Sequence, residues 1–440
     1  MITFLIELAA RLQLNIPETV GFIITWVVGL LFTVVYGCQY FYLLVSCVRK
    51  PKKYPETGRE KRYAAIIAAR NEECVLRTLI ESIRAQTYPS HLIDVFVVAD
   101  NCTDGTATVA RAAGATVFER SDTRRVGKGY ALEFLFDKIK ETKGLRHYDA
   151  YLVFDADNVL RPNFFAEMDK AYCAGNRIVT SYRNSKNYGA NWISAGYALW
   201  YLHESRHLNN ARSLLGTSAA ISGTGFLVDS GIIERNGGWR HFMLTEDIEF
   251  TVDEVLQGER IGYCHAAELF DEQPEGFAQS WRQRLRWAKG FYQVFGRYGG
   301  RLLGGILRLR WACFDMTMSV MPALVLSVFQ LAAVTALLLL NWLANGIVSL
   351  YLTRCILGFF LFAYVLVFIF GIFAVVSEWR RIHCNKWRAI ALLFTFPIFM
   401  MTYLPISIHA LFATVEWQPT AHKYAMDARD VEKAGTTKGE

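Results

Sequence analysis

Two aspartates one residue apart follow an apolar run at residues 151–154, and they are the first sign of chemistry in the chain. Side chains at positions i and i+2 of a strand face the same way, so Asp155 and Asp157 are predicted to converge. Converging carboxylates repel each other unless a cation lies nearby. A hard divalent ion that keeps part of its coordination shell for phosphate oxygens suits such a pair, whereas an acidic turn after a strand is the simpler alternative.

Polar side chains also follow two other apolar runs. Asp100 ends one of them and could accept hydrogen bonds from a uracil N–H or a ribose hydroxyl, although an Asx turn is the alternative. Asn71 and Glu72 follow the other, where a helix start capped by Asn71 would explain them equally well.

Lys128 lies between two glycines ahead of a predicted helix. Glycine lets the backbone approach a ligand closely, and a lysine at a helix N-terminus suits phosphate groups or sugar hydroxyls. The spacing is not that of a Walker motif. A second small-residue turn contains Gly223 and Thr224 and could bring backbone close to an acceptor, although such turns are more often structural.

Glu246 and Asp247 follow Thr245 at the start of a segment with helical character. One interpretation is a threonine cap on a helix whose first turn is acidic, as the helix dipole favours. The functional interpretation is a general base. In a partly closed, anionic cleft a carboxylate has a raised pKa and can remove a proton from an attacking hydroxyl.

Gln283, Arg286 and Trp287 stand at positions i, i+3 and i+4, so they share one face of a helix. An arginine can hold a pyrophosphate through paired hydrogen bonds. An indole offers a flat platform for the apolar face of a sugar ring. The alternative is an aromatic anchor at a membrane interface.

The elements that would position these residues alternate between strand and helix. Short strands are predicted at residues 64–69, 95–99, 115–118, 151–154 and 178–182, and helices at residues 72–86, 106–113, 129–140 and 162–174. This alternation predicts a mostly parallel, twisted α/β sheet with helices on both faces. Ligands of such sheets bind at the carboxyl ends of the strands, where the polar clusters fall.

Long uncharged stretches identify an integral membrane protein. Residues 20–48, 316–353 and 355–377 carry no charged side chain, and each can cross about 30 Å of hydrocarbon as a helix. A fourth apolar stretch, residues 389–415, contains two prolines and either crosses the membrane or follows a broken, re-entrant path. Basic residues directly after residue 48 place that end, and the polar region up to residue 275, in the cytosol.

A basic region separates the polar part from the later spans. Residues 276–313 contain eight basic and no acidic residues, interleaved with aromatic ones, which predicts amphipathic helices on the anionic cytoplasmic surface. Residues 1–14 could also lie along the membrane. The predicted division is therefore an N-terminal helix and first span (1–50), a cytosolic domain (54–275), interfacial helices (276–313), a membrane region (314–415) and a C-terminal tail (416–440).

Composition narrows the partners. A net charge of +7 over 440 residues gives no sign of nucleic-acid binding, and membrane lipids are the predicted surroundings. The nine cysteines are scattered without a Cys-x-x-Cys pair, so neither a zinc site nor a disulfide framework is predicted.

The order and spacing of these motifs resemble those of the family 2 glycosyltransferases. The likeness is greatest to the membrane-embedded synthases of cellulose, hyaluronan, chitin and poly-N-acetylglucosamine, and it covers about residues 64–287. It rests on Asp100, Lys128, Asp155-x-Asp157, Thr245-Glu246-Asp247 and Gln283-x-x-Arg286-Trp287. The resemblance implies a Rossmann-like cytosolic domain of the GT-A type, a UDP-sugar donor and a Mg²⁺ or Mn²⁺ cofactor.

The resemblance also implies a role for each motif. Asp157, with Asp155, would hold the metal ion, and Asp247 would be the catalytic base with Glu246 beside it. The predicted contacts to the nucleotide sugar come from Ala69, Asn71, Glu72, Asp100, Lys128, Asp155, Gln283 and Arg286. Those to the acceptor come from Trp287, Gly223 and Thr224.

The implied reaction is a single inverting displacement at the anomeric carbon of a UDP-α-sugar. The leading hypothesis is a processive synthase that extends and exports a β-linked polysaccharide, acting on a glycan acceptor. The alternative is a non-processive transferase that acts on a lipid acceptor. A transporter with a nucleotide-binding domain is disfavoured, because the spanning stretches lack charged residues.

The C-terminal tail and the number of spans bear on topology. Residues 417–423 resemble the cytosolic gating segment of these synthases, although their spacing differs. Gating requires a cytosolic C-terminus, so a path that returns to the cytosol is favoured for residues 389–415. Three or four spans are few for a polymer channel, which implies a homo-oligomer or a secretion partner. The predicted location is the plasma membrane, with several spans and a cytosolic catalytic domain.

Overall fold

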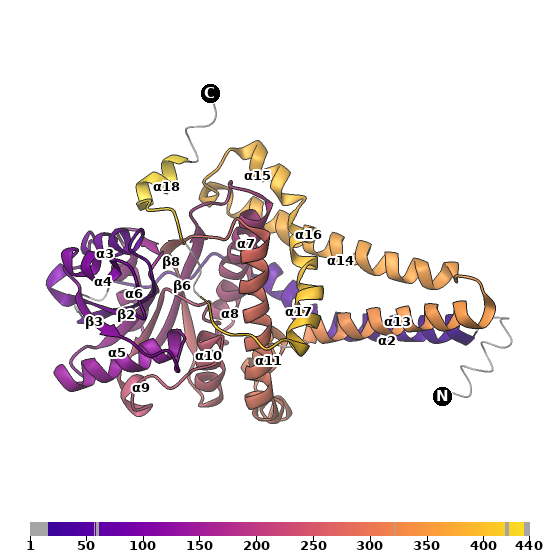
Figure 1. The fold of residues 1–440 in the computed structure, drawn as a ribbon, viewed down its shortest axis with the longest axis horizontal. Helices are drawn as coiled ribbons and strands as arrows, with labels where there is room; N and C mark the ends of the chain where they lie inside the picture. Colours follow the sequence, from indigo (N-terminus) through magenta and orange to yellow (C-terminus); the bar gives the residue numbers. More distant parts are fainter. Residues whose placement is uncertain (1–15, 57, 59–60, 321, 419–421, 435–440) are drawn as a thin grey trace.

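The computed structural model describes residues 16–56, 58, 61–320, 322–418 and 422–434. Figure 1 shows a globular α/β unit from which an arm of long helices extends. The surface-lying segment predicted for residues 1–14 falls outside the described residues.

An eight-stranded mixed sheet forms the centre of the globular unit. Its strands are β1 (Tyr63–Ala69), β2 (Ile93–Asp100), β3 (Thr116–Arg120), β4 (Ala150–Asp155), β5 (Val159–Leu160), β6 (Ile178–Ser185), β7 (Phe226–Asp229) and β8 (Ile261–Asp271). They lie in the order β3-β2-β1-β4-β7-β6-β8-β5. The first four pair in parallel, so the carboxyl ends of β1, β2 and β4 meet at one edge. β7 runs antiparallel to both β4 and β6.

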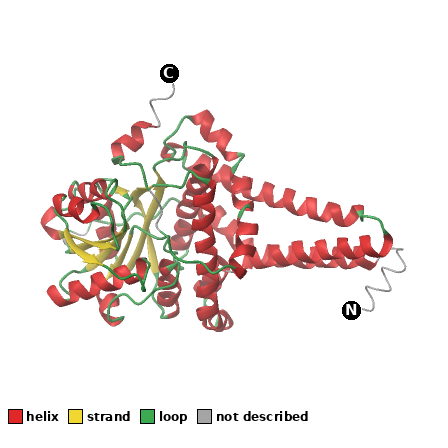
Figure 2. Ribbon diagram, in the orientation of Figure 1, coloured by secondary structure: helices red, strands yellow, loops and turns green. Residues whose placement is uncertain are grey.

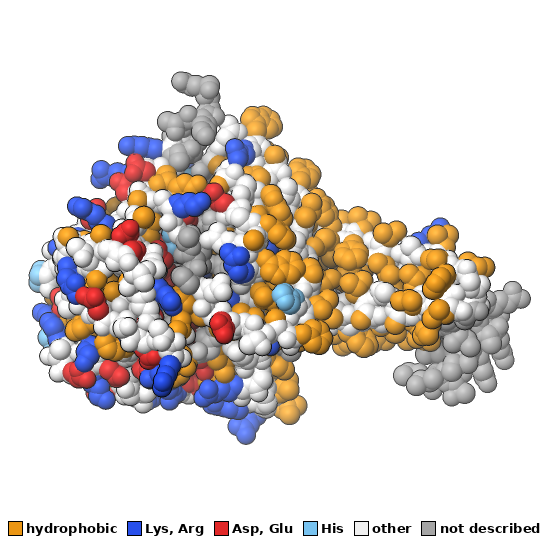
Figure 3. All heavy atoms as spheres, in the orientation of Figure 1, with side chains coloured by type: hydrophobic (Ala, Val, Ile, Leu, Met, Phe, Trp, Pro, Cys, Tyr) orange, Lys and Arg blue, Asp and Glu red, His pale blue; other side chains and the backbone are white. Residues whose placement is uncertain are grey.

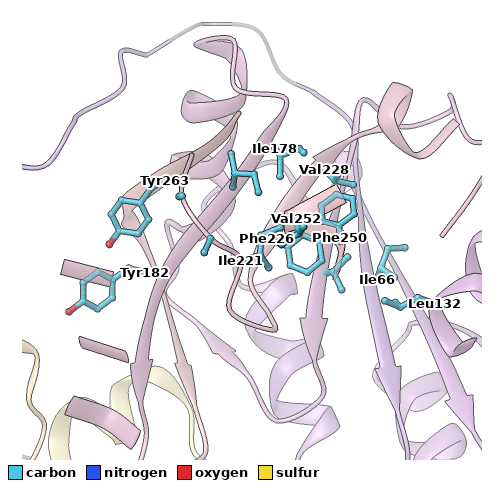
Figure 4. Close-up of a cluster of buried hydrophobic side chains, with 14 of the residues drawn as sticks. Ile66, Leu132, Ile178, Tyr182, Ile221, Phe226, Val228, Phe250, Val252 and Tyr263 are labelled. Carbon is cyan, nitrogen blue, oxygen red and sulfur yellow. The ribbon is translucent and has the colours of Figure 1, made fainter. Parts of the chain in front are cut away.

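Helices cover both faces of this sheet (Figure 2). They are α3 (Leu76–Arg84), α4 (Thr106–Ala112), α5 (Lys128–Thr142), α6 (Phe164–Cys173), α7 (Trp192–His203), α8 (Asn210–Leu214), α9 (Ser230–Arg235) and α10 (Glu246–Leu256). Successive residues of β1 point to opposite faces and enter two separate cores. Ile66 belongs to the core that contains Leu132 of α5 and Phe250 of α10 (Figure 4). Ile67 belongs to the core that contains Leu79 and Phe165.

The predicted α/β sheet is confirmed, with each of the five predicted strands close to its expected bounds. The sequence does not predict β5, β7 or β8. Two and four residues respectively are too few in β5 and β7 to show a strand period. In β8, His265 and Glu268 interrupt the apolar pattern, and the pairing with β6 shifts register between Ser181 and Tyr182.

Three helices of the described chain are long and apolar enough to cross a membrane. They lie within α2 (Ile16–Val48), α13 (Pro322–Asn345) and α14 (Leu350–Ser377). They coincide with the three uncharged stretches of the sequence and form the arm of Figure 1. Apolar side chains cover the visible face of this arm, whereas charged ones gather over the globular unit (Figure 3).

The fourth apolar stretch is broken into three short helices. These are α15 (Lys386–Leu393), α16 (Phe396–Met401), which has Pro397 near its start, and α17 (Tyr403–Phe412). The chain bends by 42° at the break after α15. In Figure 1, α16 and α17 run across the direction of the arm, along its junction with the globular unit.

A single long helix, α11 (Phe277–Leu307), occupies the basic region and packs against α17. Tyr292 donates a hydrogen bond to the Ser407 carbonyl at 3.2 Å, and Lys289 donates one to the Ala410 carbonyl at 3.1 Å. Ala410 lies in the last turn of α17, whose final carbonyls have no partner within the helix, so the Lys289 bond satisfies one of them. The face of α11 that carries the predicted functional residues is thereby held at the base of the sheet domain.

A buried ion pair joins the globular unit to the arm. Arg212 of α8 holds Asp315 of α12 (Trp311–Val320) through two hydrogen bonds of 2.7 and 2.8 Å. Tyr42 of α2 donates to the same carboxylate at 2.9 Å. A buried charge that loses its partner is costly, so these contacts fix the positions of α8, α12 and α2 relative to one another.

The C-terminal tail returns to the globular unit. It ends in α18 (Ala428–Ala434), where Glu432 pairs with Arg161 at 2.8 Å. The tail and the sheet domain therefore lie on the same side of the arm (Figure 1).

Candidate active site

Polar side chains gather at the carboxyl edge of β1, β2 and β4, as the parallel pairing requires. Ala68 of β1 lies opposite Asp155 of β4, and Ala69 lies beside the residue that precedes Asp100. Asp100 and Asp155 therefore flank the end of β1. The buried carboxylate of Asp100 accepts a hydrogen bond from Arg120 at 2.6 Å, which fixes its position.

The small-residue turn before β7 lies beside the end of β4, because these two strands are antiparallel. The hydroxyl of Thr224 accepts a hydrogen bond from the Asp155 N–H at 2.9 Å and donates one to the Asn158 side chain. Gly223 has a φ of +80°, which glycine adopts without strain. A Cβ at Gly223 would lie 3.8 Å from Oδ2 of Asp155 and 4.0 Å from Oδ2 of Asp247. The two carboxylates therefore border the same small space.

Lys128, the first residue of α5, links this edge to α10. Its ammonium group donates to the Asp155 carboxylate and, at 2.8 Å, to the carbonyl of Gly223. The same nitrogen lies 3.8 Å from Oε1 of Glu246. Burial lowers the pKa of Lys128, but Asp155 and Glu246 outweigh burial and raise it. A permanent positive charge thus stands between carboxylates from distant parts of the chain.

Glu246 and Asp247 occupy the first turn of α10, where the helix dipole favours negative charge. Burial raises the pKa of both carboxyls, that of Glu246 to about 7, while the Lys128 ammonium opposes the shift. Negative neighbours add to the shift, since Asp247 raises the pKa of Glu246 and Asp155 raises the pKa of Asp247. Carboxyls with raised pKa values in a cavity are suited to proton transfer near neutral pH.

Asp157 is fixed at the other side of the strand end. Its side chain is almost fully buried, and Oδ2 accepts a hydrogen bond from the Glu272 N–H at 3.0 Å. His422 of the C-terminal tail has Nε2 at 3.9 Å from that oxygen and Nδ1 at 2.9 Å from Oε1 of Glu72. Burial lowers the pKa of His422, but Asp157 and Glu72 outweigh burial and raise it to about 10. The tail therefore places an imidazolium between two carboxylates of the site.

The rest of the tail is anchored around His422. The N–H groups of Lys423 and Tyr424 donate to the Glu272 carboxylate at 2.8 and 2.9 Å. Trp417 lies with its ring centroid 5.2 Å from the guanidinium carbon of Arg70, a distance at which a cation–π interaction is favourable. Tail residues on both sides of the positions 419–421 thus contact the edge of the sheet.

The face of α11 that carries Gln283, Arg286 and Trp287 completes the site. Arg286 donates to the carbonyl of Leu244 at 3.2 Å, just before the acidic turn of α10. The indole of Trp287 stands edge-on to the Tyr197 ring, with centroids 5.7 Å apart. Oε1 of Gln283 is buried without a hydrogen-bond partner among the described residues, so it is available to a ligand.

One cavity of about 580 Å³ connects these groups. Of the residues predicted from the sequence, those that line it are Ala69, Glu72, Asp100, Lys128, Asp155, Asp157, Gly223, Glu246, Asp247, Gln283, Arg286 and Trp287. Asn71 and Thr224 are not among the lining residues. Asn71 is exposed, and its side-chain oxygen accepts a hydrogen bond from the Thr103 N–H at 2.8 Å. Thr224 is buried behind the turn and supports Asp155.

The structure adds polar residues that the motifs do not include. Arg183 of β6 donates to Asp271 at 2.8 Å and to the Ser222 carbonyl at 2.6 Å, and it lines the cavity. Glu204 also lines the cavity and accepts a hydrogen bond from the Ser222 hydroxyl at 2.8 Å. Glu204 begins a π-helical segment, a feature common at functional sites. It is the one acid in the sequence between residues 188 and 215, which could have marked it.

The carboxylates suit a divalent ion that is shared with a ligand. No group of three or more His, Cys, Asp or Glu side chains in the described part of the chain is placed to hold a metal by itself. Asp155 and Asp157 supply hard oxygen donors at the cavity wall. Mg²⁺ typically takes one or two protein carboxylates and completes its shell with water and substrate phosphates. The donor set therefore fits an ion that binds together with a diphosphate.

A family model described as "Glycosyltransferase like family 2" matches residues 61–290, which is more than half of the chain. The matched region begins before β1 and ends in α11, so it contains the sheet and all the cavity residues predicted from the sequence.

Curated relatives of the chain are glycosyltransferases. A probable glycosyltransferase of Bacillus subtilis, YdaM, is 27% identical over 55% of this chain and 58% of its own length. A beta-monoglucosyldiacylglycerol synthase of Synechocystis is 24% identical over 56% of this chain and 49% of its own length. A poly-beta-1,6-N-acetyl-D-glucosamine synthase of Staphylococcus aureus is 22% identical over 59% and 62%. The chain thus matches only about half to three-fifths of these relatives.

A solved structure shares the fold. It is the mannosyltransferase PcManGT of Pyrobaculum calidifontis, in complex with GDP-Man and Mn²⁺. The two chains are 15% identical and superpose with a TM-score of 0.55, over 88% of this chain and 99% of the mannosyltransferase. The globular unit therefore has the GT-A fold predicted from the sequence. Since a family model also covers this unit from before β1 into α11, the chain belongs to the glycosyltransferase-like family 2.

Proposed function

We propose that the protein transfers a sugar, with inversion, from a UDP-sugar to a hydroxyl group presented at the cytoplasmic membrane. In this proposal the donor diphosphate binds between the ends of β1, β2 and β4 and the α11 face. Asp100 accepts a hydrogen bond from the nucleoside, and Arg286 holds the diphosphate by charge-assisted hydrogen bonds. Gln283, Glu72 and Ala69, which line the cavity, complete the donor contacts, whereas Asn71 lies outside the cavity and would support this edge through its bond to Thr103.

In the proposed displacement, one bond forms and another breaks in a single step. The acceptor oxygen forms a bond to the anomeric carbon while the bond from that carbon to the diphosphate oxygen breaks. The electron pair of the broken bond leaves with UDP, and the acceptor proton passes to the carboxylate of Asp247. A single attack from the face opposite to UDP converts an α-linked donor into a β-linked product.

Asp155 and Asp157 would hold a Mg²⁺ or Mn²⁺ ion with the diphosphate oxygens, and the ion would supply positive charge to the leaving group. Lys128 remains beside Asp155 as a fixed charge, so the site has a cation even before a metal binds. The observation that supports the proposal most is this link, in which Lys128 joins Asp155 to Glu246 inside one cavity.

Two hypotheses differ in the acceptor, which is either a growing polysaccharide or a lipid. Extension and export of a β-linked polysaccharide is predicted by the resemblance, and Trp287 at the cavity wall offers the stacking platform such a glycan uses. Gly223 would approach the same acceptor, with Thr224 behind it holding Asp155 in place. Export through so few spans would need a homo-oligomer or a secretion partner. Transfer to a lipid acceptor needs neither, and the apolar end of the cavity favours it.

We also propose roles for the remaining regions. Residues 54–275 would be the cytosolic transferase domain and residues 276–313 its contact with the membrane surface. Residues 314–415, with the first span in residues 1–50, would fix the protein in the plasma membrane. The tail, residues 416–440, would close the donor end of the cavity, because His422 lies between Glu72 and Asp157.

Purified protein in detergent tests the proposal directly. A panel of radiolabelled UDP-sugars, with GDP-mannose as the contrasting donor, is supplied with membrane extract and a divalent ion. We expect one UDP-sugar to release UDP in step with incorporation of a β-linked sugar, as shown by the anomeric configuration of the product. Absence of UDP release with every donor, or an α-linked product, would contradict it.

The acid pair predicts a pH dependence. The base acts only when deprotonated, and burial raises the pKa of Glu246 to about 7 and that of Asp247 above its usual range. We therefore expect kcat/KM to rise with pH and to level off once both carboxyls are ionised, with an apparent pKa near 7 that belongs to the pair. Because Lys128 opposes the rise, Lys128→Met should move this limb to higher pH, whereas Lys128→Arg should not. If kcat/KM rose at the same pH in both variants, Lys128 would have no influence on the pKa of the two acids.

A further inference from the structure

The cavity continues past the proposed catalytic residues into the helical arm. Its lining includes Phe32 of α2, Ser327 of α13 and a row of side chains on α14. Phe359, Ala363 and Val367 are spaced by four residues, so they lie on one face of α14. With a rise of 1.5 Å per residue, this row is about 12 Å long. The cavity therefore follows a helix that can cross a membrane.

The lining of this part of the cavity is chiefly apolar. Of the described lining residues contributed by the three spanning helices, Gln39 and Ser327 are polar and the others are aromatic or aliphatic. Met401 and Leu404, from the broken helices, extend the apolar wall. A glycan hydroxyl buried there without a partner would lose its hydrogen bonds to water, which is unfavourable. An apolar chain loses no hydrogen bonds there, and methionine adapts to its irregular shape.

A polar belt separates this apolar part from the donor end. Glu204 and Arg183 both line the cavity and are held by the hydroxyl and the carbonyl of Ser222. The guanidinium carbon of Arg183 lies 3.8 Å from the ring centroid of Tyr201, which also lines the cavity. The cavity is thus polar at one end and apolar at the other, which matches a ligand with a polar head and an apolar tail.

The charges around the belt favour a neutral head. Arg183 is paired with Asp271, and Arg212, which also lines the cavity, is paired with Asp315, so neither of these cations is left to attract an anionic head. Glu204 adds a carboxylate to those of the α10 turn, and together they would repel a phosphate head. A phosphate oxygen is also ionised near neutral pH and needs no general base, whereas a hydroxyl does.

We propose that the acceptor is a neutral, hydroxyl-bearing lipid, such as a diacylglycerol, whose hydroxyl lies at Asp247 and whose chain lies along the α14 face. The proposal rests on the proposed function, since it names the acceptor of the same reaction. The lipid enters from the bilayer between the helices of the arm, and its hydroxyl loses a proton to Asp247 as the bond to the sugar forms.

The experiment compares two variants of the same helix. Ala363→Trp places an indole in the apolar part of the cavity, far from the donor residues. Leu361→Trp introduces the same side chain at a position that is 66% exposed and is not among the lining residues. Each protein is reconstituted in phosphatidylcholine vesicles that contain dioleoylglycerol, and radiolabelled UDP-sugar is added. Label in the organic phase after solvent extraction measures the glycolipid.

We expect Ala363→Trp to lower glycolipid formation by roughly fivefold to a hundredfold, the range that corresponds to the usual cost of overpacking. Leu361→Trp should keep the wild-type rate, and UDP affinity should be equal in all three proteins. In the wild type, dihexanoylglycerol should have a higher KM than dioleoylglycerol, since its chains fill less of the cavity. This second measurement does not depend on the folding of any variant.

The outcomes separate this inference from the proposed function. A water-soluble polymer as the labelled product, equal rates for the two tryptophan variants, or no dependence on chain length would overturn the lipid acceptor alone. So would labelling of a polyprenyl phosphate, supplied in parallel vesicles, in place of dioleoylglycerol. Failure to bind UDP or to transfer a sugar in any vesicle or membrane extract would instead contradict the proposed function.

Discussion

Replacing Asp247 with Asn is expected to lower kcat by roughly 10²–10⁴-fold, the usual contribution of a general base, while UDP affinity stays unchanged. Asn is similar in size but cannot accept the acceptor proton. The position of Asp247 supports a kinetic rather than a binding effect. Its Oδ2 borders the space at Gly223, whereas Glu246 is the nearer of the two acids to Lys128. UDP binding by calorimetry and single-turnover transfer of radiolabelled sugar measure the two quantities separately.

Two further variants serve as controls for Asp247→Asn. Asp137→Asn removes the same charge from an exposed position on α5 and should leave both quantities unchanged. Glu246→Gln removes the neighbouring charge and should cost less than the change at Asp247. If Asp247→Asn keeps wild-type turnover, or if Glu246→Gln has the larger effect, Asp247 is not the base.

The position of Asp247 shows what the sequence can and cannot predict. Asp100 and Asp155 were placed together correctly, because parallel strands that end in acids must bring those acids to one edge. Asp247 shares no strand with them. It reaches the edge only because β7 is inserted antiparallel beside β4. With four residues, β7 is too short to show the alternation of side chains that would predict a strand. Its spacing along the chain could therefore suggest a partner, but only the fold supplies the contact through Gly223 and Lys128.

The sequence does not predict that Glu204 and His422 belong to the site, because neither is part of a recognisable motif. Glu204 directly follows the mostly apolar helix α7, so it stands out as an acid, but the sequence does not show that it meets the Ser222 hydroxyl. His422 is brought to Glu72 by a tail that passes back over the whole domain. The contact between His422 and Glu72 spans 350 residues of sequence, so no local pattern contains it.

For the membrane region too, the sequence predicts the individual helices but not how they are arranged. Hydropathy alone identifies the three long helices, because each needs an apolar surface on all sides. It cannot show that one side of α14 faces a cavity, since Ala363 there and Leu361 on the other side are equally apolar. The bend after α15 and the path of α17 along α11 depend on packing, here through Ala288 and Ile406.

Asp157→Asn is the second change with a large expected effect. We expect it to lower transfer by roughly 10²–10³-fold, because the variant would lose the ion that stabilises the departing diphosphate, and loss of one such electrostatic contact typically costs that much. Oδ2 of Asp157 is fixed by the Glu272 N–H, so an Asn at this position keeps the shape of the site but loses the negative charge. The Mn²⁺ affinity of the UDP complex, measured by electron paramagnetic resonance, should fall in the variant.

EDTA provides a matched test on the unmodified protein. If Asp155 and Asp157 hold a divalent ion shared with the diphosphate, EDTA should weaken UDP binding to the wild type, and added Mg²⁺ or Mn²⁺ should restore it. The same treatment should have little effect on Asp157→Asn, because its UDP binding has already lost the ion. In both proteins Lys128 and Arg286 remain, so residual UDP affinity is expected, and its size reports what the protein's own cations contribute. Turnover that is equal with and without EDTA would exclude a metal from the reaction and leave Lys128, joined to Asp155, as the cation that faces the leaving group.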